Sequence, residues 1–443
     1  MNDFVVEPGG NMQGCIRVPG DKSISHRSIM FGAIADGDTS VSGLLEGEDV
    51  LATLAAFRAM GVQIEGPDNG NLLIHGAGMH GLQKPGQDLD MGNSGTAMRL
   101  LSGLLAAQSF DTTLVGDTSL NKRPMSRVID PLGQMGASID AAEGGRPPLH
   151  IRGGGKLHGI HCRMSVASAQ VKSALLLAGL YAEGRTTVTE PAPTRDHTER
   201  MLRGFGYEVP QEGATISVNG GGCLQACTIE VPADISSAAF FIVGALISPG
   251  ISPGTSPGSE LLLPHVGINP TRIGIITILK QMGAQIHLEK TREVGGEPVA
   301  DIRVQHSVLK GIPVPGDQVP LAIDEFPVLC IAAACAQGQT VIQGAEELRV
   351  KESDRITAMV AGLKTLGIAV EEKPDGMIIE GGSLGGGEVD SFDDHRVAMA
   401  FTIAGLRASK PIHVRNCRNV ATSFPDFVNL ATQAGLSLKV EAA

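Results

Sequence analysis

The chain has 443 residues, 42% of them hydrophobic and 19% charged, and its formal net charge is −12. This length predicts about two to four domains with an ample apolar core. The negative charge argues against a nucleic-acid-binding protein, which usually has a basic surface. The longest apolar runs, 238–247 and 328–336, are far shorter than the about 20 residues of a membrane-spanning helix.

The first distinctive stretch is VPGDKSISHRSIM, residues 18–30. Its proline–glycine pair indicates a chain reversal, and either Asp21 or Ser23 can cap the helix that follows. Lys22, Ser23 and Arg27 then lie in a turn and a first helical turn, where free backbone N–H groups favour anions. The stretch fits a phosphate site or an ordinary capped helix with solvated charges. The P-loop pattern GxxxxGK[ST] is absent.

The same design recurs along the chain with a period of roughly 70–80 residues, which predicts a repeat architecture. Each copy has an Ala/Leu/Ser-rich helix, a β-branched strand, a second helix, and a glycine followed by another strand. The first helices are expected at 24–35, 95–107, 168–181, 236–247, 325–336 and 395–406. The strands after them begin at Thr39, Thr112, Thr186, Thr340 and Pro411. The glycines expected to end the second helices in the left-handed conformation are Gly61, Gly136, Gly206, Gly283, Gly367 and Gly435.

Two similar segments mark where the chain crosses between halves: IRVPGDKSIS from Ile16 and IEVPADISSA from Ile229. We therefore expect an α/β protein of two similar domains with three repeat units each. The N-terminal domain would be 20–232, and the C-terminal domain would combine 1–19 with 233–443. The Pro/Gly/Ser-rich run Ser248–Ser259 is expected to be an exposed loop.

Polar and charged side chains recur at the starts of the predicted helices. Besides the first stretch, they include Asn93, Ser94, Gly95, Arg99, Lys122, Arg123, Arg127, Ser168, Gln170, Lys172, Arg195, Asp196, His197, Asn269, Arg272, Asp324, Glu325, Arg349, Lys351, Glu352, Arg355, Asp394, His395 and Arg396. If the units are alike, these starts point the same way. The two domains would then face each other across a cleft for one or two strongly anionic small molecules.

Simpler explanations exist for some of these residues. Glu352 and Arg355 are three residues apart and could be an ordinary solvated helix pair. Asp324 lies in the apolar run AIDEFPVL, so at least one of Asp324 and Glu325 is expected to be partly buried, with a cationic partner or a raised pKa. The histidines beside these charges are expected to support the site rather than catalyse: His26, His197 and His395.

The seven cysteines lack the spacing of a disulfide framework. Cys223 and Cys227 have no second pair, and the DDHR motif has no third ligand, so no metal site is expected. The first residues lack the basic start of a signal peptide. We expect a cytoplasmic protein with reduced thiols.

Eight motifs, in order, carry a family resemblance: VPGDKSISHR, GNSGTAMR, KRPM, SAQVK, RDHTE, NPTR, RVKESDR and DDHR. They resemble 5-enolpyruvylshikimate-3-phosphate (EPSP) synthases over nearly the whole chain. The resemblance implies the enolpyruvyl transferase fold, an inside-out α/β barrel whose two domains each contain three βαβαββ units. It also implies transfer of the enolpyruvyl group of phosphoenolpyruvate to the 5-hydroxyl of shikimate 3-phosphate, with release of phosphate, in the shikimate pathway to aromatic amino acids. No cofactor, metal, nucleic acid or membrane is implied, and we expect a monomer.

The family's residue roles carry over to the matching positions. Shikimate 3-phosphate would be bound by Lys22, Ser23, Arg27, Ser168, Ala169, Gln170, Arg195, Asp324 and Lys351. Phosphoenolpyruvate would be bound by Lys22, Gly95, Arg123, Gln170, Arg355 and Arg396. Asp324 is the expected base at the hydroxyl, and Glu352 or Lys22 the acid at the methylene carbon.

The chain departs from the family pattern at a few positions. Thr422 stands where many members have lysine, and Leu100 where many have proline. Ala169 and Arg195 resemble the second, glyphosate-tolerant class, but the best-known tolerant members have alanine at the position of Gly95. We expect intermediate to low sensitivity to glyphosate.

Two other functions compete with this interpretation. UDP-N-acetylglucosamine enolpyruvyl transferases share the fold and the donor, but they carry a reactive cysteine in a loop that here reads GDTSLNKRP. A non-catalytic anion-binding or RNA-associated α/β protein could use the same repeat. The acidic charge and the pairing of Asp324 with Glu352 argue against it.

Overall fold

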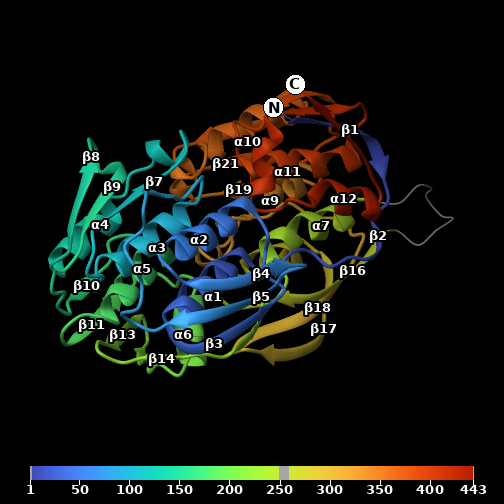
Figure 1. Ribbon diagram of the computed structural model, residues 1–443. Coiled ribbons are helices and arrows are strands. Elements are labelled where there is room, and N and C mark those ends of the chain that lie inside the picture. Colours follow the sequence, from blue (N-terminus) through green and yellow to red (C-terminus); the bar gives the residue numbers. More distant parts are fainter. Residues whose placement is uncertain (1, 249–258, 443) are drawn as a thin grey trace. The chain divides into compact units, whose positions relative to one another are not determined.

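The computed structural model describes residues 2–248 and 259–442 (Figure 1). Most of the loop expected at Ser248–Ser259 lies outside the described residues. The chain divides into two compact units. Unit 1 comprises 1–19, 232–293 and 297–443, and unit 2 comprises 20–231 and 294–296. None of the helices in the described residues is long and apolar enough to cross a membrane.

Unit 2 contains three pairs of helices and three sheets. The helices are α1 (Lys22–Ile34), α2 (Glu48–Ala59), α3 (Gly95–Leu105), α4 (Ser126–Gln134), α5 (Ala169–Gly179) and α6 (His197–Gly204). In the first sheet the order is β14-β3-β5-β4, with β15 also beside β3: β3 (Ala35–Ser42), β4 (Gln63–Asp68), β5 (Asn71–Ala77), β14 (Leu224–Gln225) and β15 (Thr228–Glu230). The second has the order β6-β7-β9-β8: β6 (Leu89–Asp90), β7 (Thr112–Val115), β8 (Ser138–Ala142) and β9 (Arg146–Arg152). The third has the order β10-β11-β13-β12: β10 (His161–Arg163), β11 (Arg185–Thr189), β12 (Gln211–Glu212) and β13 (Thr215–Asn219).

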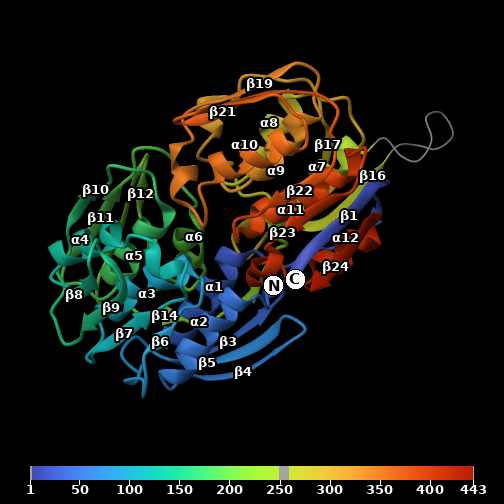
Figure 2. The ribbon, with the colours of Figure 1, turned by 90° about the horizontal axis from the view of Figure 1, so that it is seen from above.

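Unit 1 repeats this plan (Figure 2). Its helices are α7 (Ile235–Ile247), α8 (Gly274–Gln281), α9 (Phe326–Ala334), α10 (Arg355–Thr365), α11 (His395–Ala404) and α12 (Phe427–Ala434). One sheet has the order β17-β18-β16-β2: β2 (Gln13–Cys15), β16 (Glu260–Gly267), β17 (Gln285–Val294) and β18 (Glu297–Gln305). Another has the order β19-β21-β20: β19 (Gln339–Ile342), β20 (Val370–Lys373) and β21 (Gly376–Glu380). The last has the order β22-β23-β1-β24: β1 (Asn2–Gly10), β22 (Gly387–Asp390), β23 (Ile412–Arg415) and β24 (Leu436–Ala442).

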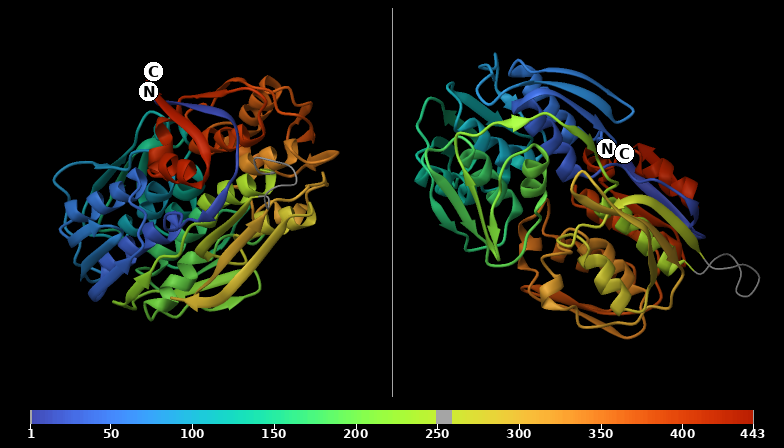
Figure 3. Two further views of the ribbon diagram at one scale, coloured as in Figure 1. Left: turned by 90° about the vertical axis from the view of Figure 1, so that its right-hand side faces the viewer. Right: turned by 90° about the horizontal axis from the view of Figure 1, so that it is seen from below.

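Both chain ends belong to one sheet of unit 1. Strand β1 lies between β23 and β24 and pairs antiparallel with both, so that Phe4 faces Val414 on one side and Val440 on the other. Figure 3 shows this blue strand beside the red end of the chain. Strand β2 runs parallel to β16. The first 19 residues therefore complete sheets whose other strands come from the second half of the sequence.

The sequence periodicity has a direct structural explanation. The first helix of each repeat is largely buried; every residue of α7 is buried, and α7, α9 and α11 pack against one another. The predicted glycines all adopt positive φ, from 80° at Gly206 to 116° at Gly435. This conformation lets the chain leave a helix and enter a sheet without a steric penalty.

Two local predictions were wrong. After Gly206, residues 207–210 form no strand, because Pro210 has no N–H to donate to a sheet ladder; only the short β12 follows. Several first helices also end one or two residues earlier than predicted. The end of α11 tightens into the 3₁₀ helix η4 (Gly405–Arg407) instead of continuing.

Candidate active site

Helix starts in both units carry side-chain caps. A side-chain oxygen accepts a hydrogen bond from a backbone N–H in the first turn of α1 (Asp21), α3 (Ser94), α5 (Ser168), α7 (Asp234), α10 (Asp354) and α11 (Asp394). For α1 the cap is therefore Asp21 and not Ser23. These caps fix where each helix begins, and so fix the residues beside it.

Lys22 and Arg27 lie on α1 in unit 2. Lys22 is the first residue of the helix and forms an ion pair with Asp49. Arg27 lies in the second turn, not the first turn as predicted, and its side chain is buried. Its Nε donates to Thr198 Oγ1 at 2.7 Å and its Nη2 to Ser173 Oγ at 2.8 Å. Arg27 thus connects α1 to α5 and α6.

Ser23 and His26 complete the start of α1. The carbonyl of Ser23 accepts from Arg27 Nη1 at 2.9 Å, and the Ser23 side chain is half-buried. His26 Nδ1 lies 2.8 Å from Thr53 Oγ1 on α2. Burial and the nearby cation of Lys22 hold the pKa of His26 well below its usual value. His26 is therefore a neutral, buried side chain that joins α1 to α2.

Gly95 and Gln170 start neighbouring helices of unit 2, and Arg99 connects them. Arg99 Nη1 donates to Gln170 Oε1 at 2.6 Å, and Gln170 Nε2 donates to Thr96 Oγ1 at 2.9 Å. A Cβ atom at Gly95 would lie 2.8 Å from Arg99 Nη1. A side chain at this position would displace the arginine.

Arg123 presents a positive charge near the start of α3. Its Nη2 donates to Asn93 Oδ1 at 2.7 Å and to Ser119 Oγ at 3.2 Å. Both acceptors are neutral. Within the described residues Arg123 forms no ion pair with a carboxylate, so its charge remains available to an anion.

The remaining predicted residues of unit 2 lie at α5 and before α6. Ser168 caps α5 and Ala169 is its first residue. Arg195 is half-buried in the segment between β11 and α6.

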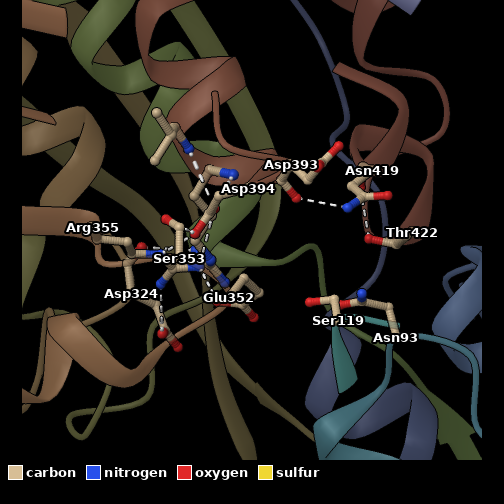
Figure 4. A network of polar contacts seen from close by, with 12 residues as sticks. Asn93, Ser119, Asp324, Glu352, Ser353, Arg355, Asp393, Asp394, Asn419 and Thr422 are labelled. Carbon is tan, nitrogen blue, oxygen red and sulfur yellow. Dashed lines mark hydrogen bonds and ion pairs between the residues drawn. The ribbon is translucent and has the colours of Figure 1, made fainter. Parts of the chain in front are cut away.

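Arg355 is the centre of a polar network in unit 1 (Figure 4). Its Nη2 lies 2.5 Å from Glu352 Oε2, its Nε 2.8 Å from Asp394 Oδ2, and its Nη1 3.6 Å from Asp324 Oδ1. Ser353 Oγ also donates to Asp394. The Arg355 side chain is only 1% exposed, so Glu352 and Arg355 are not the solvated pair considered above. Burial would lower the pKa of Arg355, but Asp394 and Glu352 outweigh burial and raise it.

Glu325 connects two further arginines, Arg272 and Arg396, to this network. Ser236 Oγ donates to Glu325 Oε1, which lies 3.9 Å from Arg272 Nη2 and 3.8 Å from Arg396 Nη1. Arg396 Nη1 also donates to the carbonyl of Asp324 at 3.0 Å. Burial, and next the cation of Arg355, lower the pKa of Arg396, although its guanidinium stays charged. The prediction that Asp324 or Glu325 is buried beside a cation is confirmed, most fully for Glu325.

Lys351 and Thr422 lie at the edge of this cluster. Lys351 is half-buried directly after the 3₁₀ helix η3 (Glu346–Val350) and next to Glu352. The hydroxyl of Thr422 donates to the carbonyl of Asn419 at 2.7 Å, and Asn419 donates to the carbonyl of Asp393 (Figure 4). Thr422 therefore stabilises the turn before α12. Among residues 2–248 and 259–442, His, Cys, Asp and Glu side chains nowhere gather in threes as metal ligands would.

A family model described as EPSP synthase (3-phosphoshikimate 1-carboxyvinyltransferase) matches residues 6–430. The chain belongs to the EPSP synthase family. Full-length relatives named 3-phosphoshikimate 1-carboxyvinyltransferase support this. The protein of Methylococcus capsulatus is 64% identical, covering 99% of this chain and 98% of the relative. That of Acidithiobacillus ferrooxidans is 62% identical over the whole of both chains.

Solved structures show the same relationship. An EPSP synthase from Acinetobacter baumannii superposes with a TM-score of 0.89 at 58% identity, covering 100% of both chains. The enolpyruvyl transferase NikO from Streptomyces tendae has a TM-score of 0.79 at 16% identity, covering 100% of this chain and 99% of that one, and shows the fold alone. The chain thus has the enolpyruvyl transferase fold of the EPSP synthase family, as predicted.

Several residues that organise the site of this EPSP synthase family member had no specific role assigned from the sequence. Asp394 was recognised only as a helix-start residue of the DDHR motif, but it caps α11 and also holds Arg355. Arg99 was recognised only as a helix-start residue. Ser173 and Thr198, which receive Arg27, gave no signal, because buried hydroxyls are common in helices.

Proposed function

We propose that residues of both units form one active site in a cleft between them, where shikimate 3-phosphate and phosphoenolpyruvate bind together. As a member of its family, the chain transfers the enolpyruvyl group of phosphoenolpyruvate to the 5-hydroxyl of shikimate 3-phosphate, giving 5-enolpyruvylshikimate 3-phosphate and phosphate. This is a step of aromatic amino acid biosynthesis. The proposal concerns which side chains perform it.

Shikimate 3-phosphate is assigned to the helix starts of α1 and α5 and to two residues of unit 1. The residues are Lys22, Ser23, Arg27, Ser168, Ala169, Gln170, Arg195, Asp324 and Lys351. The capped start of α5, with free N–H groups beside Ser168, supports a phosphate there. Asp324 and Lys351 supply an acceptor and a donor suited to ring hydroxyls.

Phosphoenolpyruvate is assigned to three arginines, a lysine, a glutamine and a glycine. The residues are Lys22, Gly95, Arg123, Gln170, Arg355 and Arg396. Arg123 has neutral partners, which supports a role in binding phosphate. Each charged hydrogen bond contributes about 1.5–3 kcal/mol. The bare Cα of Gly95 leaves space beside Arg99 and Arg123.

The chemistry needs a base and an acid. Asp324 takes the proton of the 5-hydroxyl as its oxygen attacks, and a proton is added to the methylene carbon. Phosphate then leaves the tetrahedral intermediate as its methyl group returns a proton to the group that donated one, which restores the C=C bond of the enolpyruvyl product. Glu352 is the proposed proton donor, and Lys22 is the alternative. The observation that carries this assignment is the buried guanidinium of Arg355, which holds Asp324 and Glu352 in one network.

Release of inorganic phosphate tests the assignment. Purified protein is given phosphoenolpyruvate with either shikimate 3-phosphate or UDP-N-acetylglucosamine, in parallel with Asp324→Asn and Glu352→Gln. We expect release only with shikimate 3-phosphate and a loss of at least about 100-fold in Asp324→Asn, within the range of general base catalysis. Release of phosphate with UDP-N-acetylglucosamine would contradict shikimate 3-phosphate as the specific acceptor. Full activity of Asp324→Asn would contradict the role of Asp324 as the base.

The proton donor needs a separate measurement. Exchange of solvent deuterium into the methylene group reports protonation of that carbon. If Glu352 donates, Glu352→Gln abolishes exchange and Lys22→Met retains it in enzyme saturated with both substrates. The opposite pattern would assign the proton to Lys22.

We also propose that the chain belongs to the second, glyphosate-tolerant class and has intermediate to low sensitivity to glyphosate. Ala169, Arg195 and the motifs RPM, SAQVK, RDHTE and NPTR support the class. Gly95 argues against the strongest tolerance, because no methyl group crowds the inhibitor there. A micromolar inhibition constant, competitive with phosphoenolpyruvate, would contradict this proposal.

The chain is proposed to act in the cytoplasm as a monomer, without nucleic acid. The seven cysteines are free thiols, which supports a reducing compartment. Sedimentation of the purified protein tests the monomer; a mass near twice 46.0 kDa would contradict it.

A further inference from the structure

Three buried charged side chains of unit 2 have no place in the assignment above. Lys172, on the first turn of α5, is 1% exposed. Its Nζ lies 2.7 Å from Glu199 Oε1 and 3.0 Å from Glu190 Oε2. Glu199 is completely buried. In the described residues, neither glutamate pairs with any other cation.

The two glutamates lie at either side of one segment. Glu190 directly follows β11, and Glu199 lies in the first turn of α6. Between them runs the segment 191–198, which contains Arg195. Thr194 Oγ1, next to Arg195, donates to the other oxygen of Glu190. One ammonium group therefore holds both ends of the segment against the start of α5.

This arrangement is costly if its only role is stability. Burying ions carries a desolvation penalty of several kcal/mol each, and apolar replacements of similar volume are often as stable. Burial raises the pKa of Glu190, and Lys172 is the cation that opposes this effect. Arg27 already connects α5 to α6 through Ser173 and Thr198. Arg27 thus links the two helices independently of Lys172, whereas Lys172 contacts the residues at either side of the segment 191–198.

We propose that Lys172 is a positioning residue for shikimate 3-phosphate. By fixing Glu190 and Glu199, it sets the place of Arg195 relative to Ser168 and Gln170, one turn before it on α5. The inference rests on the proposed function of Arg195. Lys172 itself is buried and does not touch substrate.

A double-mutant cycle tests this inference. Lys172→Met is combined with Glu199→Gln so that the net charge of the three-residue cluster is unchanged, and the pair is placed in the natural and the Arg195→Ala backgrounds. In the natural background we expect the KM and the directly measured Kd for shikimate 3-phosphate to rise about 10-fold. The KM for phosphoenolpyruvate should stay within about twofold. In the Arg195→Ala background the same change should have no further effect, because Lys172 acts through Arg195.

A milder variant covers the case in which the buried pair cannot be replaced without unfolding. Thr194→Val removes only the hydroxyl that ties the segment to Glu190, and should raise the Kd for shikimate 3-phosphate about threefold. The matched control is Arg152→Met with Asp140→Asn, an exposed ion pair of the same unit. This control should change neither the KM nor the Kd for shikimate 3-phosphate.

The outcomes separate the two proposals. If Arg195→Ala leaves the Kd unchanged, the assignment of Arg195 fails. If Arg195→Ala weakens binding while Thr194→Val and the Lys172 variant do not, the positioning role is overturned. Equal increases in both KM values, or effects that add fully to that of Arg195→Ala, would also overturn it.

Discussion

His26 is a buried imidazole that stays neutral in the folded chain, fixed by Thr53 and near Ser94 at 3.4 Å. Its pKa is depressed by burial, whereas in the unfolded chain it is near the ordinary value of about 6.5. Above that value neither state is protonated, and His26 adds no pH dependence. As the pH falls below it, only the unfolded chain takes up the proton, so stability is lost down to the lower pKa of the folded state. The limiting slope is about 1.4 kcal/mol per pH unit.

Urea unfolding from pH 7.5 to 5 should therefore show that the free energy of unfolding falls more steeply with acid in the natural protein than in His26→Asn. Equal slopes would show that His26 is protonated in the fold.

At the scale of elements, the segment that carries Lys351 and Glu352 is secured by Arg349 at its start. Arg349 donates to the carbonyls of Lys373 and Pro374 at 2.6 and 2.7 Å, and to Asp354 Oδ2 at 2.8 Å. It thereby connects η3, the cap of α10 and the turn after β20. We expect Arg349→Ala to lower kcat about 10-fold and to speed amide exchange in 346–354, because several hydrogen bonds of about 0.5–1.5 kcal/mol are lost. The control is Arg152→Ala, because Arg152 is exposed and lies on β9, outside the segment that carries Lys351 and Glu352. Unchanged exchange in Arg349→Ala would contradict this role.

The features that could be predicted from the sequence are those that single residues and single elements determine. The helices and their terminal glycines were predictable because local chemistry decides them: an apolar helix must be buried, and a glycine such as Gly61 relieves a left-handed turn. The missing strand after Gly206 depended on whether Pro210 would tolerate a ladder position. Glu352 and Arg355 could be paired from their spacing, but the contact of Arg355 with Asp394, 39 residues away, depends on how α10 and α11 pack. Such long-range partners leave no periodic trace in the sequence.

At the scale of the whole molecule, cationic helix starts occur in both units, and like charges repel one another until an anion neutralises them. We expect an open form that closes on shikimate 3-phosphate. Small-angle scattering should show a smaller radius of gyration when shikimate 3-phosphate is added. Salt at 1 M, with a screening length of about 3 Å, should weaken the repulsion between these charges. It should therefore bring the radius of gyration of the free protein part of the way toward that of the bound form. A radius unaffected by saturating shikimate 3-phosphate would contradict closure.

The position of β1 between β23 and β24 also determines the order in which the chain matures on the ribosome. Residues 20–231, which form all of unit 2 except 294–296, emerge as one uninterrupted stretch, so this unit can fold while translation continues. Unit 1 cannot fold completely at this stage, because β1 pairs with β23 and β24, which are synthesised much later. At about 5–20 residues per second, the delay is on the order of 20–90 s. During that time the nascent N-terminus has an unsatisfied strand edge, which invites pairing with other chains. Unit 1 therefore closes only after β23 and β24 have been synthesised.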